Sequence, residues 1–275
     1  MSDTTNEPIA EHAVSQRVEI VRIAAGKRTP QTDQLAEETA VALEFNGISY
    51  ATMLATPADL EDFAIGFSLT EGLVADRREI RGVDVLPACD GVVVQVEIAT
   101  EREVAMKSRR RAMAGRTGCG LCGVESLDQV IRPVGRVPVG APVSLARLAA
   151  AMTAMRRRQT LHELTGATHA AGFMAADGSL GDVREDVGRH NALDKLIGAM
   201  ARGRIDPTGG AAIVSSRASY EMVQKAASAG MGVLAAVSAP TALAVRLAED
   251  AGIVLIGFMR GDQCVVYTHA ERVSD

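Results

Sequence analysis

The pattern of apolar and polar positions divides the chain into two regions with different rhythms. In the first hundred residues or so, short stretches of alternating apolar and polar side chains predict β-strands. These strands are expected at residues 18–23, 39–45, 48–54, 79–86 and 92–98. Asn46 and Gly47, between the second and third stretches, predict a tight hairpin turn.

A helix is expected directly after this hairpin. Thr56 is a candidate N-cap, Pro57 suits the first helical position, and Gly72 can end the helix. Residues 15–105 therefore predict a β-rich α+β domain. The polar and acidic residues 1–14 before it are expected to form a disordered tail.

The second region, residues 143–275, has the rhythm of an α/β domain. A helix is expected after Ser144 as N-cap, and a hairpin at 169–175 and 180–185. Helices at 189–200, 219–231 and 240–251 then alternate with short apolar strands at 211–215, 233–237 and 253–259. This alternation predicts right-handed crossovers and a largely parallel sheet covered on both faces. The order of elements resembles the cytidine-deaminase-like three-layer α/β/α fold.

Residues 106–142, between the two regions, lose the periodicity and predict a basic interdomain connection that contains a functional loop. Within them, Cys119 and Cys122 form a CxxC motif among three glycines at 118–123, just after a basic run. Glycine-rich sequence packs poorly, and nearby cations favour thiolate over thiol. We therefore expect an exposed, mobile and reactive pair of thiols.

Other uses of a CxxC motif fit this context less well. A structural zinc site usually needs four ligands, and no second CxxC is present. A thioredoxin-like dithiol normally follows a strand, which the pattern does not predict here. A zinc deaminase would need an H-x-E motif before its cysteines, and no H-x-E motif precedes Cys119. Zinc and redox roles stay open from the spacing alone, while the context favours nucleophilic chemistry.

Composition and charge narrow the class of protein. The 275 residues are 47% hydrophobic and 23% charged, with a net charge of −5, so a general nucleic-acid binder is not expected. No apolar stretch is long enough for a spanning helix and no secretory signal is recognisable, which predicts a soluble cytoplasmic protein. Four cysteines do not make a disulfide framework, and Cys89 and Cys264 are expected to be packed.

Ligands of open α/β sheets bind beyond the carboxyl ends of the parallel strands. Three segments fall there in the predicted order of elements, namely 184–195, 215–219 and 258–263. They contain acidic, basic, hydroxyl and imidazole side chains suited to an anionic ligand. Each also has a structural explanation, because acids and hydroxyls cap helices and single histidines such as His169 and His190 are often structural.

The ordered set of motifs resembles the FdhD family of formate dehydrogenase accessory proteins. The resemblance runs from about residue 18 to the C-terminus. It is carried by residues 61–67, 70–72, 118–123, 169–171, 184–195, 219–225, 238–241 and 260–261. Ser216 and Ala167 depart from the expected pattern, in which glycine is common at both positions.

The resemblance implies a sulfur carrier that acts as a sulfurtransferase. A cysteine desulfurase would load sulfane sulfur onto Cys119 as a persulfide, with Cys122 as the partner thiol. The carrier would deliver this sulfur to the molybdenum cofactor, bis-molybdopterin guanine dinucleotide, before its insertion into formate dehydrogenase. The resemblance also implies a homodimer, and it implies no metal-binding site in the protein itself. The alternative is a cofactor-binding chaperone whose thiols ligate metal or sense redox state.

The resemblance also implies which residues contact the cofactor, for which a guanine nucleotide such as GDP would be an analogue. The cofactor-binding residues are expected to be Phe258, Met259, Arg260, Gly261, Asp262, Gln263, Asp186, Arg189, His190, Ser215 and Arg217.

Overall fold

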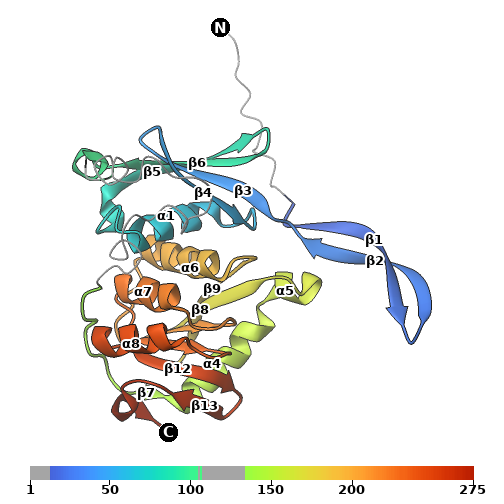
Figure 1. The fold of residues 1–275 in the computed structure, drawn as a ribbon. Helices are drawn as coiled ribbons and strands as arrows, with labels where there is room; N and C mark the ends of the chain where they lie inside the picture. Colours follow the sequence, from blue (N-terminus) through green and yellow to red (C-terminus); the bar gives the residue numbers. More distant parts are fainter. Residues whose placement is uncertain (1–12, 105, 107–133) are drawn as a thin grey trace.

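The computed structural model describes residues 13–104, 106 and 134–275 of the chain. Within these residues the protein is built from stacked layers (Figure 1). A four-stranded sheet lies on helix α1, α1 lies on helix α6, and α6 covers a six-stranded sheet. The expected tail at 1–14 and the connection at 106–142 lie largely outside the described residues.

The N-terminal sheet has the strand order β4-β3-β6-β5. Its elements are β3 (Thr39–Phe45), β4 (Ile48–Ala55), α1 (Leu60–Thr70), the short 3-10 helix η1 (Arg77–Glu79), β5 (Ile80–Ala88) and β6 (Gly91–Ile98). Alternate residues of β3 and β6, such as Val41, Leu43 and Val94, are buried beneath α1. The strands predicted from alternation are therefore confirmed, and positive φ angles at Asn46 and Gly47 form the predicted tight turn.

The predicted start of α1 is wrong. The helix begins at Leu60, after Asp59 in a left-handed conformation, and not at Thr56. Thr56 is buried and bonds to the other layer instead, because its hydroxyl accepts from the backbone N–H of Val187 at 3.1 Å. A residue with cap chemistry has thus been used to join two units of the fold.

The C-terminal sheet has the strand order β13-β12-β11-β10-β8-β9. Its elements are β8 (His169–Met174), β9 (Leu180–Asp186), α6 (Arg189–Gly203), β10 (Ala211–Val214), α7 (Tyr220–Ser228), β11 (Val233–Ala236), α8 (Ala242–Ala251), β12 (Val254–Arg260) and β13 (Gln263–Val266). Strands β10, β11 and β12 are parallel, whereas β8, β9 and β13 run antiparallel to their neighbours. The sheet is therefore mixed and not largely parallel, because short turns join the outer pairs of strands.

Helices cover both faces of this sheet, as predicted. Alternate residues of the central strands, such as Ala212 and Leu234, pack against α6, α7 and α8. The intervening residues, such as Ile213 and Ala235, pack against α4 (Leu145–Arg157). The Ser144 hydroxyl caps α4 as predicted. The closer assignment to the cytidine-deaminase-like fold stays a prediction.

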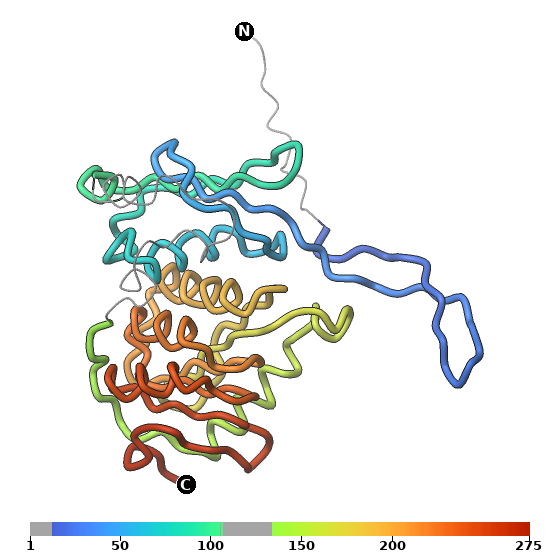
Figure 2. The backbone as a smooth tube through the Cα atoms, viewed as in Figure 1, coloured from blue at the N-terminus to red at the C-terminus, as the bar shows by residue number. Residues whose placement is uncertain are grey.

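The remaining elements were not predicted from the sequence, or were predicted only in part. Strands β1 (Ser15–Ala24) and β2 (Lys27–Ala36) form a ribbon that projects from the body (Figure 2). The prediction missed β2 because both faces of the ribbon meet solvent, so no apolar alternation is required. The short helix α5 (Thr160–Thr165) and a pairing of β7 (Val143–Ser144) with β14 (Val273–Ser274) complete the fold, with the 3-10 helix η2 (Ala270–Arg272) before β14. No helix in the described part of the chain is long and apolar enough to cross a membrane.

The layers meet most closely where α1 crosses α6. A Cβ added to Gly66 of α1 would overlap the carbonyl oxygen of Asp194, and one added to Gly198 of α6 would overlap that of Asp62. The two helix backbones are therefore in direct contact, which only glycine allows at these positions.

We predict that Gly198→Ala lowers the free energy of unfolding by about 1–3 kcal/mol, because the added methyl group forces the two helices apart. The matched control is Gly203→Ala in the same helix, where a Cβ meets only ordinary contacts with Ile205. The control should change stability by less than about 1 kcal/mol, in the stabilising direction. Urea denaturation followed by circular dichroism measures both, and equal effects of the two variants would contradict the close crossing.

Candidate functional site

The carboxyl ends of four strands and the N-termini of three helices meet at one edge of the C-terminal sheet. The loops that follow β10 and β11 and the last residues of β12 are hydrogen-bonded in a row. The backbone N–H of Ser238 donates to the Ser216 carbonyl, and that of Phe258 donates to the Ser238 carbonyl, each at 3.3 Å. All three segments that the sequence assigned to strand ends therefore lie along this edge, which is where open α/β sheets bind ligands.

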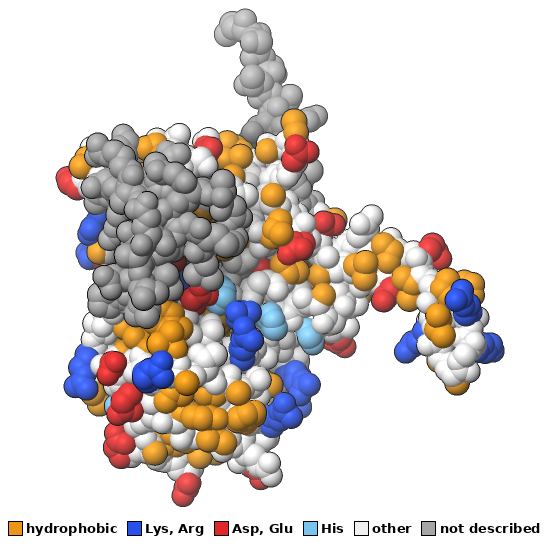
Figure 3. Space-filling model, in the orientation of Figure 1, with side chains coloured by type: hydrophobic (Ala, Val, Ile, Leu, Met, Phe, Trp, Pro, Cys, Tyr) orange, Lys and Arg blue, Asp and Glu red, His pale blue; other side chains and the backbone are white. Residues whose placement is uncertain are grey.

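Three basic side chains, those of Arg189, Arg217 and His169, lie near one another at this edge. Burial lowers the pKa of Arg189, and the positive charge of Arg217 lowers it further. Burial likewise lowers the pKa of His169, with Arg189 as the next cause. The Nε of Arg189 is buried and has no hydrogen-bond partner. Figure 3 shows histidine and basic side chains near the middle of this face. Such an arrangement suits an anion, which would give these cations a partner.

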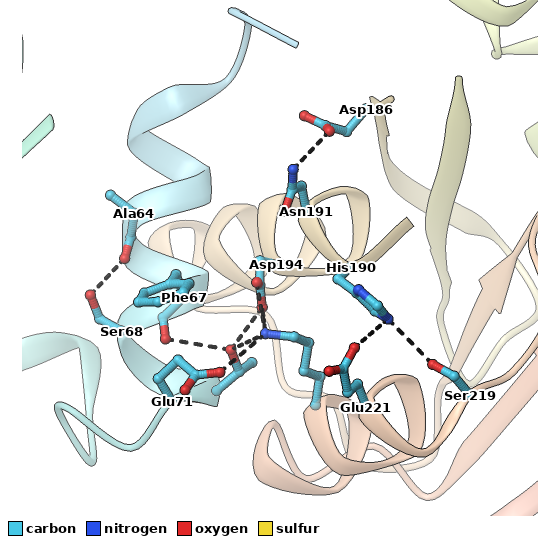
Figure 4. Close-up of polar contacts among 12 residues, drawn as sticks. Ala64, Phe67, Ser68, Glu71, Asp186, His190, Asn191, Asp194, Ser219 and Glu221 are labelled. Carbon is cyan, nitrogen blue, oxygen red and sulfur yellow. Dashed lines mark hydrogen bonds and ion pairs between the residues drawn. The ribbon is translucent and has the colours of Figure 1, made fainter. Parts of the chain in front are cut away.

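His190 has a different role from Arg189, although it is the next residue. Its Nε2 lies 2.6 Å from a Glu221 carboxylate oxygen and 3.3 Å from the Ser219 hydroxyl, so the ring faces the start of α7 (Figure 4). The hydrogen bond from His190 lowers the pKa of Glu221. The sequence did not single out Glu221, because an acid in the first turn of a helix is usually explained by the helix dipole.

Asp186 was expected to contact the cofactor, and its surroundings assign it to positioning instead. The carboxylate is completely buried. It lies 2.6 Å from the Lys195 ammonium and accepts hydrogen bonds from the backbone N–H groups of Thr56 and Gly188 and from the Asn191 amide. No oxygen is left for a ligand. Asp186 therefore fixes the start of α6, which carries Arg189 and His190.

Ser215 and Arg217 follow β10 and are placed differently. The Ser215 hydroxyl accepts a hydrogen bond of 2.8 Å from the backbone N–H of Ala170, which links the end of β10 to β8. Arg217 is exposed, with no partner among the described residues. Of the two, Arg217 is the side chain that is free to meet a ligand.

The last predicted segment, 258–263, comprises the end of β12, the turn at residues 261–262 and the first residue of β13. Phe258 is 42% exposed and has a φ of 53°, in the left-handed region that a bulky residue rarely adopts. An exposed aromatic ring held in a strained backbone conformation is suited to stacking against a flat ligand group. Arg260, Gly261, Asp262 and Gln263 are also exposed. The Met259 side chain is instead buried in the core against α4 and is not exposed at this edge.

The cysteines divide into two groups. Cys119 and Cys122, the predicted reactive pair, lie outside the described residues. Cys89 was expected to be packed, and this is wrong, because it lies exposed in the turn between β5 and β6. Cys264 is half-buried beside the core of the C-terminal sheet, where burial raises the pKa of its thiol. Neither described cysteine has the environment of a reactive thiolate.

A family model matches most of the chain. The model is that of the FdhD/NarQ family, and it matches residues 36–274.

Curated relatives cover nearly the whole sequence. A relative from Bordetella petrii is 60% identical over 243 residues, which cover 88% of this chain and 87% of the relative. Relatives from Bordetella bronchiseptica and Cupriavidus necator are 56% and 53% identical and cover 98% and 96% of this chain, and 98% and 92% of their own lengths. All three are named sulfur carrier protein FdhD.

A solved structure has the same fold. It is the crystal structure of a proposed formate dehydrogenase accessory protein from Desulfotalea psychrophila, with a TM-score of 0.74 and 24% sequence identity. The similarity covers 95% of this chain and 100% of that chain.

We predict that inorganic pyrophosphate raises the pKa of His169, which burial and Arg189 hold below the ordinary value near 6.5 in the free protein. An anion beside Arg189 opposes the positive charge that now disfavours protonation of the ring. Histidine NMR titrations with and without pyrophosphate measure the shift, and His169→Asn identifies the signal. Arg189→Gln should raise the pKa in the free protein and reduce the response. An unchanged His169 titration at saturating pyrophosphate would show that the anion does not bind at this edge.

Proposed function

Because the chain belongs to the FdhD/NarQ family, we propose that it is a sulfur carrier that serves the maturation of formate dehydrogenase. The relatives that share 53–60% of its residues carry the name of sulfur carrier. We further propose that the protein works in the cytoplasm as a homodimer and that a cysteine desulfurase is its sulfur donor.

The thiol chemistry of this proposal is a sequence of exchanges at sulfur. The Cys119 thiolate attacks the outer sulfur of the donor's persulfide, a new S–S bond forms, and the donor thiolate leaves. Cys122 can then attack the inner sulfur of the Cys119 persulfide, which forms a disulfide between the two cysteines and releases hydrosulfide. A cellular dithiol reductant restores both thiols. Glycines and cations around this motif favour accessible thiolates.

The acceptor in this proposal is bis-molybdopterin guanine dinucleotide, bound at the edge of the C-terminal sheet. The observation that carries this assignment is the buried Nε of Arg189, which has no partner and lies near a second arginine, Arg217. A pyrophosphate group would supply the missing acceptor. The exposed ring of Phe258 would stack on a guanine base. The geometry thus suits a ligand that is both anionic and aromatic.

A second candidate function uses the same edge without sulfur transfer. In it, the protein is a cofactor-binding chaperone whose two thiols ligate metal or sense redox state. Both candidates require nucleotide binding at the sheet edge, so only the thiols distinguish them. Two experiments therefore test the proposal, one for the thiols and one for the edge.

We predict that incubation with a cysteine desulfurase and cysteine adds one sulfur, about 32 Da, to the wild-type protein. The adduct should be absent from Cys119→Ala and present on Cys122→Ala, as intact mass spectrometry can show. Cys89→Ala is the matched control, since its thiol is exposed but lacks the cationic surroundings. No adduct on the wild type, together with dehydrogenase activation by both variants of the pair, would favour the chaperone over the carrier.

We predict that GDP binds at the sheet edge and that Phe258→Ala and Arg189→Gln each weaken this binding roughly tenfold, through loss of stacking and of a phosphate contact. Isothermal titration calorimetry measures the dissociation constants. Phe258→Tyr keeps the ring and should bind normally, and Arg78→Gln, an exposed arginine of η1, should have no effect. If all four variants bind GDP as the wild type does, the nucleotide site lies elsewhere.

A further inference from the structure

The ribbon of β1 and β2 is the part of the described chain with the least support from its own fold (Figures 1 and 2). The two ten-residue strands are paired along their full length, from Ser15 with Ala36 to Ala24 with Lys27. A strand of this length extends for about 33 Å. Helix α5 packs against part of β2, while the distal half projects away from the body. Since an isolated two-stranded ribbon is only marginally stable in water, a partner is expected to support it.

The distal half of the ribbon combines apolar and basic side chains. Val21 and Ile23 are 58% and 61% exposed. The pairing places them on one face with Pro30 and Arg28, while Arg22 lies on the other face. No acidic residue occurs between residues 20 and 32. We call this segment, residues 21–30, the ribbon tip.

The ribbon tip is suited to contact through its face and poorly suited to strand addition. Pro30 has no backbone N–H to donate to a further strand along β2. Aliphatic side chains on one face, with a long basic side chain beside them, instead bury well against a flat apolar surface that has acids at its border. Such a surface occurs on this same chain.

That surface is the outer face of the N-terminal sheet, on the side opposite α1. Leu54 and Leu86 are 57% and 40% exposed there. The strand register sets them in one patch with the neighbouring small and aliphatic side chains of Ala40, Ala42 and Val93. The alternate residues of the same strands are buried under α1. No other element in the described part of the chain packs on this apolar patch.

Acidic side chains border this patch at one end. Glu44 and Asp84 lie in the same row of the sheet, on either side of Gln95. Glu97 follows on β6 and is near one arginine, Arg81, at 3.8 Å. The patch is thus complementary to the ribbon tip, because its apolar side chains match Val21 and Ile23 and its acidic border matches the basic side chains.

We propose that the ribbon tip of one copy docks on the outer face of the N-terminal sheet of a second copy, and that the exchange is reciprocal. The ribbon has four basic and two acidic residues in a chain whose net charge is −5, so the rest of the chain attracts it. The ribbon projects away from its own sheet, which leaves the sheet of a second copy as the matching surface. A two-fold axis then buries two such contacts at once. This inference rests on the homodimer of the proposed function and does not depend on sulfur transfer.

Sedimentation equilibrium of the full chain tests the surface. The wild type should dimerise, and Val21→Ser with Ile23→Ser should raise the dissociation constant roughly tenfold or more. Val139→Ser is the matched control, because Val139 is 76% exposed and belongs to neither surface. Added salt should weaken the wild-type dimer, since the charges that meet are near solvent. A monomeric wild type, or a dimer that the ribbon substitutions leave unchanged, overturns the proposal.

Cross-linking between two pools of protein tests the pairing of the two surfaces. Both pools carry serine in place of Cys89, Cys119, Cys122 and Cys264, so that only introduced thiols react. One pool carries Ile23→Cys and the other Leu86→Cys. Mild oxidation of the mixture should yield a dimer whose peptide map joins the two introduced thiols. A dimer linked only between identical copies overturns the reciprocal exchange. Persulfide loading of the ribbon variant, made with its native cysteines, should equal that of the wild type, so a failed dimer is distinguishable from a failed carrier.

Discussion

The backbone contact between α1 and α6 is the constraint on which the other parts of the structure depend. Gly66 and Gly198 allow the two helices to touch through their main chains, so the four-stranded sheet is fixed against the six-stranded one. Helix α6 begins at the edge where the candidate site lies, with Arg189 as its first residue. A shift of the crossing would therefore move the site as well as the interface. The glycines join the stability of the fold to the position of its chemistry.

The buried charges around this crossing are paired, whereas one buried cation at the candidate site, Arg189, is not. Burial alone would lower the pKa of Lys225, but the Asp194 carboxylate outweighs it and raises the pKa. The Lys225 ammonium lies 2.8 Å from that carboxylate and also donates to the Thr70 hydroxyl of α1. Arg189 has no such partner for its buried Nε. This contrast supports the proposal that Arg189 meets an anionic ligand.

The sequence predicted the elements whose pattern reflects burial, and missed those whose pattern does not. Alternation in β3 and β6, and the order of strands and helices after residue 189, reflect contact with a core, so they could be read from the chain. Strand β2 meets solvent on both faces and gave no signal. The helix-cap role predicted for Thr56 is wrong, and nothing in the local pattern indicated that Thr56 and Asp186 bond to distant segments. Local spacing cannot distinguish a residue that caps or binds from one that joins two layers.

The positions of Phe258 and of the unpaired Nε of Arg189 set a minimum size for a ligand that contacts both at the sheet edge. The exposed ring of Phe258 offers a stacking surface and the Nε of Arg189 lacks a hydrogen-bond partner, so a ligand gains both interactions only if it reaches both residues. Phe258 belongs to β12. Arg217, the cationic neighbour of Arg189, lies in the loop that follows β10, and β11 separates β10 from β12. Two strand spacings amount to about 10 Å. A single phosphate cannot span that distance, whereas a nucleotide with its base at one end and its phosphates at the other can. The separation of the two features therefore favours a nucleotide-sized ligand over a simple anion.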